Sequence, residues 1–250
     1  MQTPDQARDL AQDLVSRAMA AGATAADAVF ACDASTDVQM RLGALEDVQR
    51  SESASIGLRV FHGKQSASVS GADVSPQGLA TLAERAVAMA RLAPEDAYAG
   101  LAPEERLMRG PLPDLELDDG GDPDPALLRE LALACEDAAR AVPGVTNSEG
   151  GSASAIRSVM ALATSHGFCG SYGGSRYGVA ASVLAARDGQ MERDSASHST
   201  RFLADLESAE DIGRRAGERA VGRLGTGKIE SGPMPVVYDR RAGGSLLGPL

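Results

Sequence analysis

The sequence has few aromatic residues and few cysteines, and both shortages narrow what the chain can do. Only 3% of its 250 residues are aromatic and there is no tryptophan, which disfavours a function that depends on stacking against aromatic side chains. The three cysteines, Cys32, Cys135 and Cys169, are widely spaced and include no CxxC pair. This pattern predicts neither a disulfide framework nor a zinc ribbon, and it is typical of a protein from a reducing cytoplasm.

Positive charge is also scarce. The formal net charge is -11, with no compensating basic block, and this disfavours nucleic-acid binding because the phosphate backbone would be repelled. The N-terminal stretch MQTPDQARDLAQDL is acidic where a signal peptide is basic. No apolar run approaches the roughly 18 residues of a membrane span. We therefore expect a soluble, cytoplasmic protein that has neither nucleic acid nor a membrane as a partner.

The sequence does contain four clear helix starts. Three of them combine a capping residue with a proline at the first helical position, where the missing amide hydrogen costs nothing. These three begin at Thr3-Pro4, Ser75-Pro76 and Asp124-Pro125. A fourth candidate opens at Ser208, with Asp211 three residues later. Apolar residues follow each start at helical spacing, which predicts four surface helices with one buried stripe each.

Between and after these helices the apolar period changes to two, in short stretches separated by Gly, Ser and Asp. Five stretches lie between the first two helices: DAVFACD, DVQMRLG, EDVQRSES, SIGLRVFHG and KQSASVSGA. Four follow the third helix: VTNSEGG, SAIRSVMALATS, RYGVAASVLAAR and QMERDSASHST, the last two joined by the hairpin signal Asp188-Gly189. Because strands and helices come in segregated runs, the sequence predicts an α+β fold. We expect antiparallel or mixed sheets with helices packed on them in two layers, not a doubly wound parallel sheet.

The stretch at 94–123 is rich in Pro, Gly and acidic residues and has little periodicity. Such a stretch is typical of a solvated connector between two structured parts. We therefore divide the chain into a helix–β-meander–helix half at 1–93, the connector at 94–123 and a second α+β half at 124–228.

One segment has the spacing of a phosphate-binding loop. GRLGTGKI, from Gly222 to Ile229, places its glycines and its lysine correctly. However, Ile229 stands where the loop needs a Ser or Thr to hold magnesium, and the segment follows a helix where the loop must follow a strand. A glycine-rich helix exit is the favoured interpretation.

A thiol dyad of Cys169 and His198 is a second hypothesis, since HGFCGSYGGSRYG, which contains Cys169, is the most glycine-dense segment. The string CGSY copies only a fragment of one protease signature, and such fragments do not transfer between families. A small buried cysteine, among glycines that allow tight turns between twisted strands, is favoured instead.

Neither the histidines nor the carboxylates form a recognisable catalytic motif. The three histidines include no i, i+4 pair and no HExxH, so a zinc site would need ligands from three distant strands. They are His62, His166 and His198. Glu149, Glu192 and Asp194 are predicted at strand ends as turn and salt-bridge residues, with general acid–base catalysis less favoured. The residues by themselves predict a soluble α+β protein without a visible active site.

Several blocks, in their order and spacing, resemble the PmbA/TldE branch of the TldD/PmbA family over nearly the whole chain. NSEGG, SHGF and MERD are the most characteristic of them, and PVVYDRRAGGSLLG closes the series. The resemblance implies the N-terminal portion of a longer two-domain protein, with 229–250 as the start of a truncated C-terminal domain. It also implies a non-catalytic subunit that pairs with a TldD-type subunit, or forms a homodimer in isolation. The family's heterodimer is a cytosolic zinc-dependent protease that acts on unfolded or flexible peptides.

In the TldD branch a His-Glu-x-x-x-His motif lies on a helix, where two imidazoles hold zinc and the glutamate acts as base. The resemblance places Gly248 at the position of the first histidine and Pro249 at that of the glutamate, and neither residue has the required side chain. The second histidine would fall beyond Leu250. We therefore expect no catalytic residue, no metal ligand and no cofactor in this chain, with zinc in the partner subunit.

Two other interpretations stay open. In one, the chain belongs to a metalloprotease subunit whose metal ligands lie in the missing C-terminal half. In the other, it is a regulatory module that binds peptides or a partner without hydrolysis. The sequence assigns no substrate-binding residues, and it does not identify the peptides that are processed.

Overall fold

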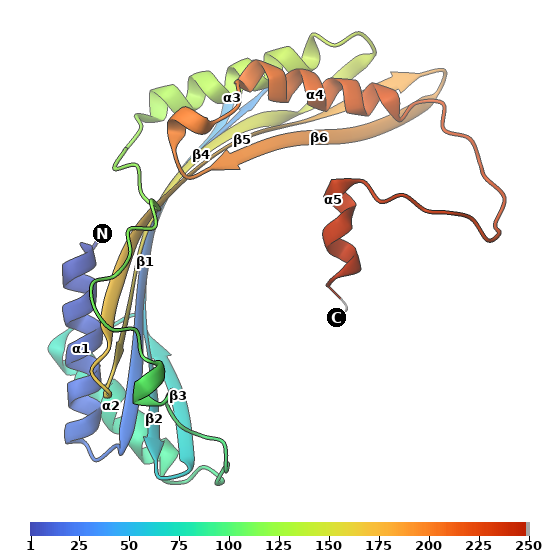
Figure 1. The fold of residues 1–250 in the computed structure, drawn as a ribbon. Coiled ribbons are helices and arrows are strands. Elements are labelled where there is room, and N and C mark those ends of the chain that lie inside the picture. Colours follow the sequence, from blue (N-terminus) through green and yellow to red (C-terminus); the bar gives the residue numbers. More distant parts are fainter. Residues whose placement is uncertain (249–250) are drawn as a thin grey trace.

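One six-stranded sheet runs through both halves of the computed structural model, which describes residues 1–248 (Figure 1). All neighbouring strands are antiparallel, in the order β3-β2-β1-β4-β5-β6. The strands are β1 (Ala25–Arg41), β2 (Ala44–His62), β3 (Gln65–Gly71), β4 (Val145–Thr164), β5 (Cys169–Arg187) and β6 (Gln190–Thr200). The helices are α1 (Pro4–Ala20), α2 (Pro76–Ala90), α3 (Pro125–Arg140), α4 (Ala209–Gly222) and α5 (Arg240–Gly243), with 3-10 turns at Glu104–Arg106, Leu203–Asp205 and Gly244–Leu246. The predicted α+β class is confirmed.

Local sequence decides where the four long helices begin. Each capping side chain accepts a hydrogen bond from a backbone amide in the first turn of its helix, at Thr3, Ser75, Asp124 and Ser208. At α1, the side chain of Gln6 accepts a bond from the amide of Thr3 at 2.9 Å, which completes a capping box. All four predicted starts are confirmed. The longest described helix, α1, has 17 residues, and none in this part of the chain is long and apolar enough to cross a membrane.

The strands are much longer than the sequence predicts. β1, β2, β4 and β5 contain 17, 19, 20 and 19 residues, so the predicted short strands are wrong, although β1, β2 and β3 form the expected antiparallel meander. The breaks expected at Gly43 and Gly63 are turns between strands. The polar stretches at 33–37, 51–55 and 151–154 lie within continuous strands, where small polar side chains on the open face of the sheet are tolerated. The predicted hairpin is confirmed, since Asp188 and Gly189, with φ values of 52° and 79°, join β5 to β6.

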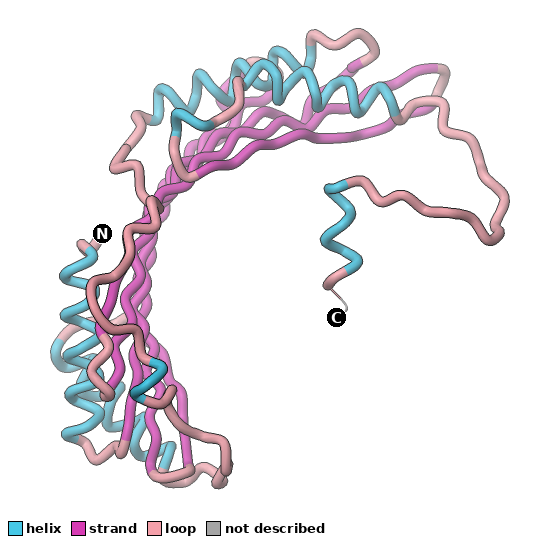
Figure 2. Tube along the Cα trace, in the orientation of Figure 1, coloured by secondary structure: helices cyan, strands magenta, loops and turns pink. Residues whose placement is uncertain are grey.

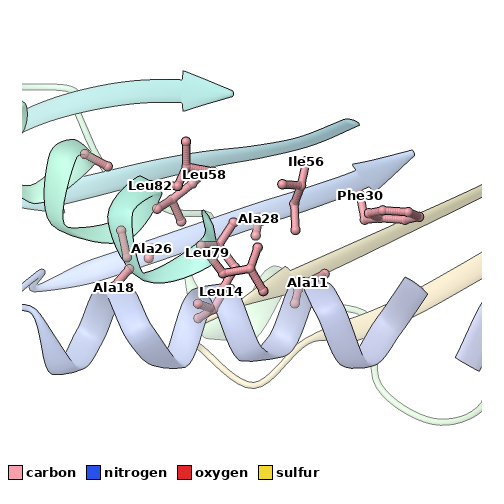
Figure 3. Close-up of a cluster of buried hydrophobic side chains, with 14 of the residues drawn as sticks. Ala11, Leu14, Ala18, Ala26, Ala28, Phe30, Ile56, Leu58, Leu79 and Leu82 are labelled. Atoms are coloured by element: carbon pink, nitrogen blue, oxygen red, sulfur yellow. The ribbon is translucent and has the colours of Figure 1, made fainter. Parts of the chain in front are cut away.

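Two helix pairs pack on the same face of the sheet, at opposite ends of the long strands. α1 and α2 cover one end, α3 and α4 cover the other, and both pairs lie on the convex side of the curved sheet (Figure 1, Figure 2). In β1 the buried side chains are even-numbered at both ends, at Phe30 and again at Val38 and Met40, which places both cores on one face. Figure 3 shows the first core, in which Leu14 of α1 and Leu79 of α2 lie over the strands.

A buried carboxylate joins the second helix pair to the turn between β1 and β2. Glu136 of α3 is fully buried, and its two oxygens accept hydrogen bonds from the amides of Leu42 at 2.7 Å and Gly43 at 3.0 Å. Both turn residues have positive φ, 51° and 77°, as in a tight hairpin turn. Burial alone would raise the pKa of Glu136. Hydrogen bonds from Ser148, Gly43 and Leu42 outweigh that effect, and the net pKa lies below its ordinary value.

Helix α3 lies close to β4 because β4 carries glycines where the two meet. A Cβ atom at Gly151 would overlap the carbonyl oxygen of Ala132, and Gly150 has a φ of 122°. Both glycines belong to the NSEGG motif. The register of β4 against β5 shifts between Ser148 and Gly150, which is the mark of a β-bulge. This motif therefore serves the packing of α3 on the sheet.

The stretch at 94–123 is not simply solvated, because its second half packs along β5. β6 pairs with β5 only as far as Tyr177, and beyond that point the amide of Ser175 donates to the carbonyl of Leu117 at 2.9 Å. The Tyr177 hydroxyl donates to Asp119 at 2.6 Å, and burial together with this bond raises the pKa of Tyr177 to about 12. The connector thus covers the part of the β5 edge that β6 leaves unpaired.

We predict that Glu136→Gln lowers the free energy of unfolding by about 1.5–3 kcal/mol at neutral pH, because an amide group cannot accept hydrogen bonds at both ends as a carboxylate does. The folded-state pKa of Glu136 lies below the unfolded one. The ionised Glu136 side chain therefore makes its full contribution to the free energy of unfolding at pH values above its unfolded-state pKa of about 4.3. This contribution is lost as the pH falls through the folded-state pKa. Urea unfolding of both proteins over this pH range measures the difference.

Glu130→Gln is the matched control, because it makes the same change at an exposed position of α3. It should unfold at the wild-type urea concentration at every pH. A Glu136→Gln protein as stable as the wild type at neutral pH would contradict the role of this carboxylate.

Candidate functional site

The concave face of the sheet has no helical layer from α1 to α4, because both pairs lie on the convex side (Figure 2). Alternation along the strands places on it the side chains that enter neither core. Most of these are small and polar. The serines on this face include Ser35 of β1, Ser51, Ser53 and Ser55 of β2, Ser68 and Ser70 of β3, Ser152, Ser154 and Ser158 of β4, Ser182 of β5, and Ser195, Ser197 and Ser199 of β6. The result is a broad surface that is rich in hydroxyl groups.

Three exposed, large aliphatic side chains gather on this surface toward the end covered by α1 and α2. Val29 lies opposite Leu162 in the ladder of β1 with β4, and Met160 lies opposite Ala31, two residues further along β1. Val29, Leu162 and Met160 are 40%, 37% and 58% exposed. We call these three residues the Met160 patch. A shallow hollow of about 500 Å³ adjoins the patch at Val29 and is lined also by the charged pair of Asp27 and Arg59, so there is open space beside the patch for a side chain of a bound chain.

Acidic side chains follow β1 along the same face. Asp27 forms an ion pair with Arg59 of β2, and this hydrogen bond raises the pKa of the Arg59 guanidinium. Asp33 accepts a hydrogen bond from the Ser53 hydroxyl at 2.7 Å, whereas Asp37 is exposed. The surface therefore presents carboxylate and hydroxyl oxygens, groups that bind the amides of an extended chain.

The structure does not bring Cys169 and His198 together. Cys169 pairs with Ala163 near one end of β5, whereas His198 lies opposite Val179, ten residues further along the strand. At about 3.3 Å per residue, the two are separated by about 33 Å. The thiol of Cys169 lies 3.9 Å from the carbonyl oxygen of Arg8, and burial raises its pKa. This geometry excludes a thiol dyad of these two residues.

The three histidines do not converge either. His62 ends β2, and His166 lies in the turn after β4, with its Nδ1 3.3 Å from the carbonyl oxygen of Ala102. His198 accepts a hydrogen bond from the amide of Glu207 at 3.2 Å. Among the described residues, no three His, Cys, Asp or Glu side chains are arranged to hold a metal ion. The donor set of this part of the chain therefore does not fit zinc.

The carboxylates singled out in the sequence are engaged in ion pairs at strand ends. Glu149 accepts hydrogen bonds from Ser182 at 2.7 Å and from Arg193 at 2.8 Å, and these bonds lower its pKa. The other pairs are Glu192 with Arg223 at 3.4 Å, and Asp194 with Arg223 and Arg241 at 3.5 Å each. All three are salt-bridge residues, as the sequence predicts, and none faces a partner base.

The two remaining candidate sites, the segment with the spacing of a phosphate-binding loop and the end of the chain, have no catalytic geometry among the described residues. α4 ends at Gly222, and the amide of Gly225 donates to the side chain of Gln190 at 3.0 Å, so GRLGTGKI is a helix exit, as predicted. Gly248 lies in the turn that follows the last 3-10 helix. Pro249 lies outside the described residues.

Sequence reasoning missed the concave face because no single residue type marks it. It arises from alternation in strands that lie far apart in the chain. A signal was present in RSESAS and SASHST, where serines recur at every second position. Such a pattern is equally compatible with a polar loop, and only the pairing of these stretches into one sheet distinguishes the two.

Comparisons with known proteins match both halves of the chain. The model of the PmbA/TldA metallopeptidase domain 1 matches residues 26–90, and that of the PmbA/TldA metallopeptidase central domain matches residues 118–224. Metalloprotease PmbA of Escherichia coli O157:H7 is 33% identical over 214 residues, which are 85% of this chain and 47% of that protein. The Metalloprotease PmbA homolog of Haemophilus influenzae is 32% identical over 225 residues, 90% of this chain and 49% of that protein. The chain thus spans about half the length of the curated relatives it matches.

Two solved structures are similar in fold. A Bacteroides thetaiotaomicron protein, named as a suggested modulator of DNA gyrase, has a TM-score of 0.84 at 24% identity, over 93% of this chain and 53% of that one. TldE from Thermococcus kodakarensis has a TM-score of 0.71 at 16% identity, over 85% of this chain and 47% of that one. At these identities the likeness concerns the fold alone.

The environment of Cys169 predicts an unreactive thiol. Because burial raises its pKa, its thiolate fraction is smaller than that of free cysteine at the same pH, and iodoacetamide should label it more slowly. Timed labelling followed by peptide mapping measures the rate, with the denatured protein as the control. Labelling of native Cys169 faster than free cysteine would contradict this prediction and indicate an activated thiol.

Proposed function

Since the chain belongs to the PmbA/TldD family of metallopeptidases, we propose that it is the N-terminal part of a non-catalytic subunit of the PmbA/TldE type. In the cytoplasm it pairs with a TldD-type catalytic subunit, and in isolation it forms a homodimer. The heteromeric complex degrades or processes unfolded or flexible peptides. Residues 229–250 begin the C-terminal domain of this subunit.

The concave face is the observation that carries this proposal. A peptidase that spares folded proteins has to enclose its reaction chamber, because exclusion by size needs walls more than it needs additional catalytic groups. A curved sheet without a helix from α1 to α4 on its inner side is suited to form one wall (Figure 1). Its serines and aspartates can hydrogen-bond an extended backbone, and the Met160 patch can accept an apolar side chain of the peptide.

In this proposal the metal belongs to the partner. The names of the relatives imply a metal ion, and zinc is the ion that the family resemblance implies. The described residues supply no suitable donor set, and Gly248 stands at the position that the resemblance gives to a histidine ligand. The TldD-type subunit would hold the zinc that activates water, while this chain binds the peptide and excludes folded proteins.

The division of labour is testable by reconstitution. We predict that the full-length protein, its TldD-type partner and zinc together cleave a flexible peptide, and that the full-length protein alone does not. A chelator should abolish cleavage, and a tightly folded small domain should stay intact in the same reaction. Mass spectrometry of the products over time measures both substrates.

Two outcomes would decide against the proposal. Cleavage by the full-length protein alone, abolished by a chelator, would place the metal ligands in its own C-terminal half. Peptide that stays intact and bound in the presence of the partner and zinc would indicate a regulatory binding module without hydrolysis.

The wall function predicts a position-specific effect of added bulk and charge. Met160→Arg places a long cation on the concave face and should lower the kcat/KM of the reconstituted complex severalfold, because it obstructs the surface along which the peptide lies. Met89→Arg makes the same change on the outer surface of α2, where Met89 is 43% exposed, and should leave kcat/KM unchanged. Equal activity of the two variants, at equal thermal stability and equal pairing with the partner, would contradict a peptide path over the Met160 patch.

A further inference from the structure

The outer edge of β2 is unpaired over more than half of its length. β3 pairs with β2 only at Ile56–His62, and no described strand pairs with the outer edge of Ala44–Ser55. Nearly every residue of this stretch is exposed, so neither of its faces is covered. We call Ala44–Ser55 the free edge of β2. Backbone groups along such an edge are available to pair with another strand.

The other strand edges are treated differently. The connector lies along the part of β5 that lacks β6, with the bond from Ser175 to Leu117. β3, the edge strand beside β2, has only 7 residues and is bridged at Gln65 by Glu95. At the opposite edge, Arg219 of α4 donates to the carbonyl of Ser195 in β6 at 3.0 Å. Among the described residues the free edge of β2 has no comparable cover.

The side chains of the free edge are complementary to themselves. Its regular part, Asp47–Ser55, reads DVQRSESAS, with Arg50 and Glu52 on either side of Ser51. If a second copy pairs antiparallel with Ser51 opposite Ser51, each Arg50 faces a Glu52, and each Val48 faces an Ala54. Directly opposed unlike charges stabilise an antiparallel pair. In an antiparallel pairing shifted by two residues, with Gln49 opposite Ser51, Arg50 would face a second Arg50.

All four of these side chains lie on one face of β2, because their β1 partners Val38, Thr36, Ala34 and Cys32 alternate in the same phase. Within one chain, Arg50 and Glu52 approach only to 3.5 Å, at 70% and 56% exposure. Such a pair contributes little, and both side chains are free to turn toward a neighbour. The shift in register between Gln39 and Met40 lies opposite Glu46, and this bulge ends the regular edge at Asp47.

We propose that the free edge of β2 is a homotypic docking surface, at which a second copy of the chain adds antiparallel with Ser51 on the two-fold axis. The two six-stranded sheets then continue into each other. Nine paired residues a side bury less area than the roughly 1,200–2,000 Å² of a stable interface, so contact through this edge alone is weak and reversible. This inference rests on the homodimer of the proposed function and names the surface through which two copies meet. Its test measures the register of the paired strands and not peptide cleavage, so this inference can be wrong while the proposed function is right, and the reverse.

Cysteine cross-linking tests the register. Ser51→Cys places two thiols directly opposite each other, at a spacing that a disulfide can bridge. Ser53→Cys is the matched control on the same face, because Ser53 faces Gln49 and lies about 13 Å along the strand from its own counterpart. In the full-length protein without partner, mild oxidation should form Ser51→Cys dimers at least about tenfold faster than Ser53→Cys dimers. The wild type, with its native cysteines, gives the background on non-reducing gels.

Charge reversal tests the pairing of Arg50 with Glu52. On the Ser51→Cys background, Arg50→Glu should slow dimer formation, because Glu then faces Glu. Adding Glu52→Arg should restore the rate, since the exchanged pair is again complementary. Equal cross-linking of Ser51→Cys and Ser53→Cys would overturn the proposal, as would a rate that is unchanged by Arg50→Glu. Absence of Ser51→Cys dimers above background would also overturn it and indicate that another segment or partner covers this edge.

Discussion

The antiparallel ladder between β1 and β4 holds the two halves of the molecule together. It pairs Asp27–Met40 with Gly151–Thr164, segments that belong to different halves and are separated in the chain by β2, β3, α2, the connector and α3. Bringing such distant segments together costs chain entropy, which the burial of both cores offsets. The strands of this ladder run from one core into the other and are longer than the helices that pack on them. Each helix pair therefore covers only one end of the sheet. The arched shape and the open concave face follow from this long, shared pair of strands.

Small side chains make this arrangement possible. On the convex face, alanines such as Ala26, Ala28 and Ala161 are buried under α1 and α2, and their size allows the helices to lie close to the strands. Glycines of β4 let α3 approach the backbone directly. On the concave face, many of the side chains are those of serines. The shortage of aromatic residues is therefore consistent with the fold, since a curved sheet with closely packed helices has little room for large side chains.

Two acidic side chains hold neighbouring parts of the fold together. Glu136 accepts the amides of the turn between β1 and β2, and Asp119 accepts Tyr177 and the amide of Leu203 at 3.1 Å, which ties the connector to the sheet. Both carboxylates have lowered pKa values, because hydrogen bonds to the charged form outweigh the effect of burial. Perturbed carboxylates are often catalytic candidates. Here their partners are backbone amides and the hydroxyl groups of a tyrosine and two serines of the scaffold, so the perturbation is structural.

The sequence by itself determined the helix starts, the hairpin at Asp188-Gly189 and the α+β class, because caps and tight turns depend on residues within a few positions of each other. The sequence also identified NSEGG by its resemblance to a family motif. It did not indicate that Gly151 allows α3 to lie close to β4. Only the tertiary structure decided the length of the strands, the separation of Cys169 from His198, and the concave face. A serine between two apolar residues is compatible with a loop or a strand. Pairing with another strand decides between them, and these partner strands lie far away in the sequence. The pairing of distant segments, which no local pattern encodes, therefore decided which residues share a surface.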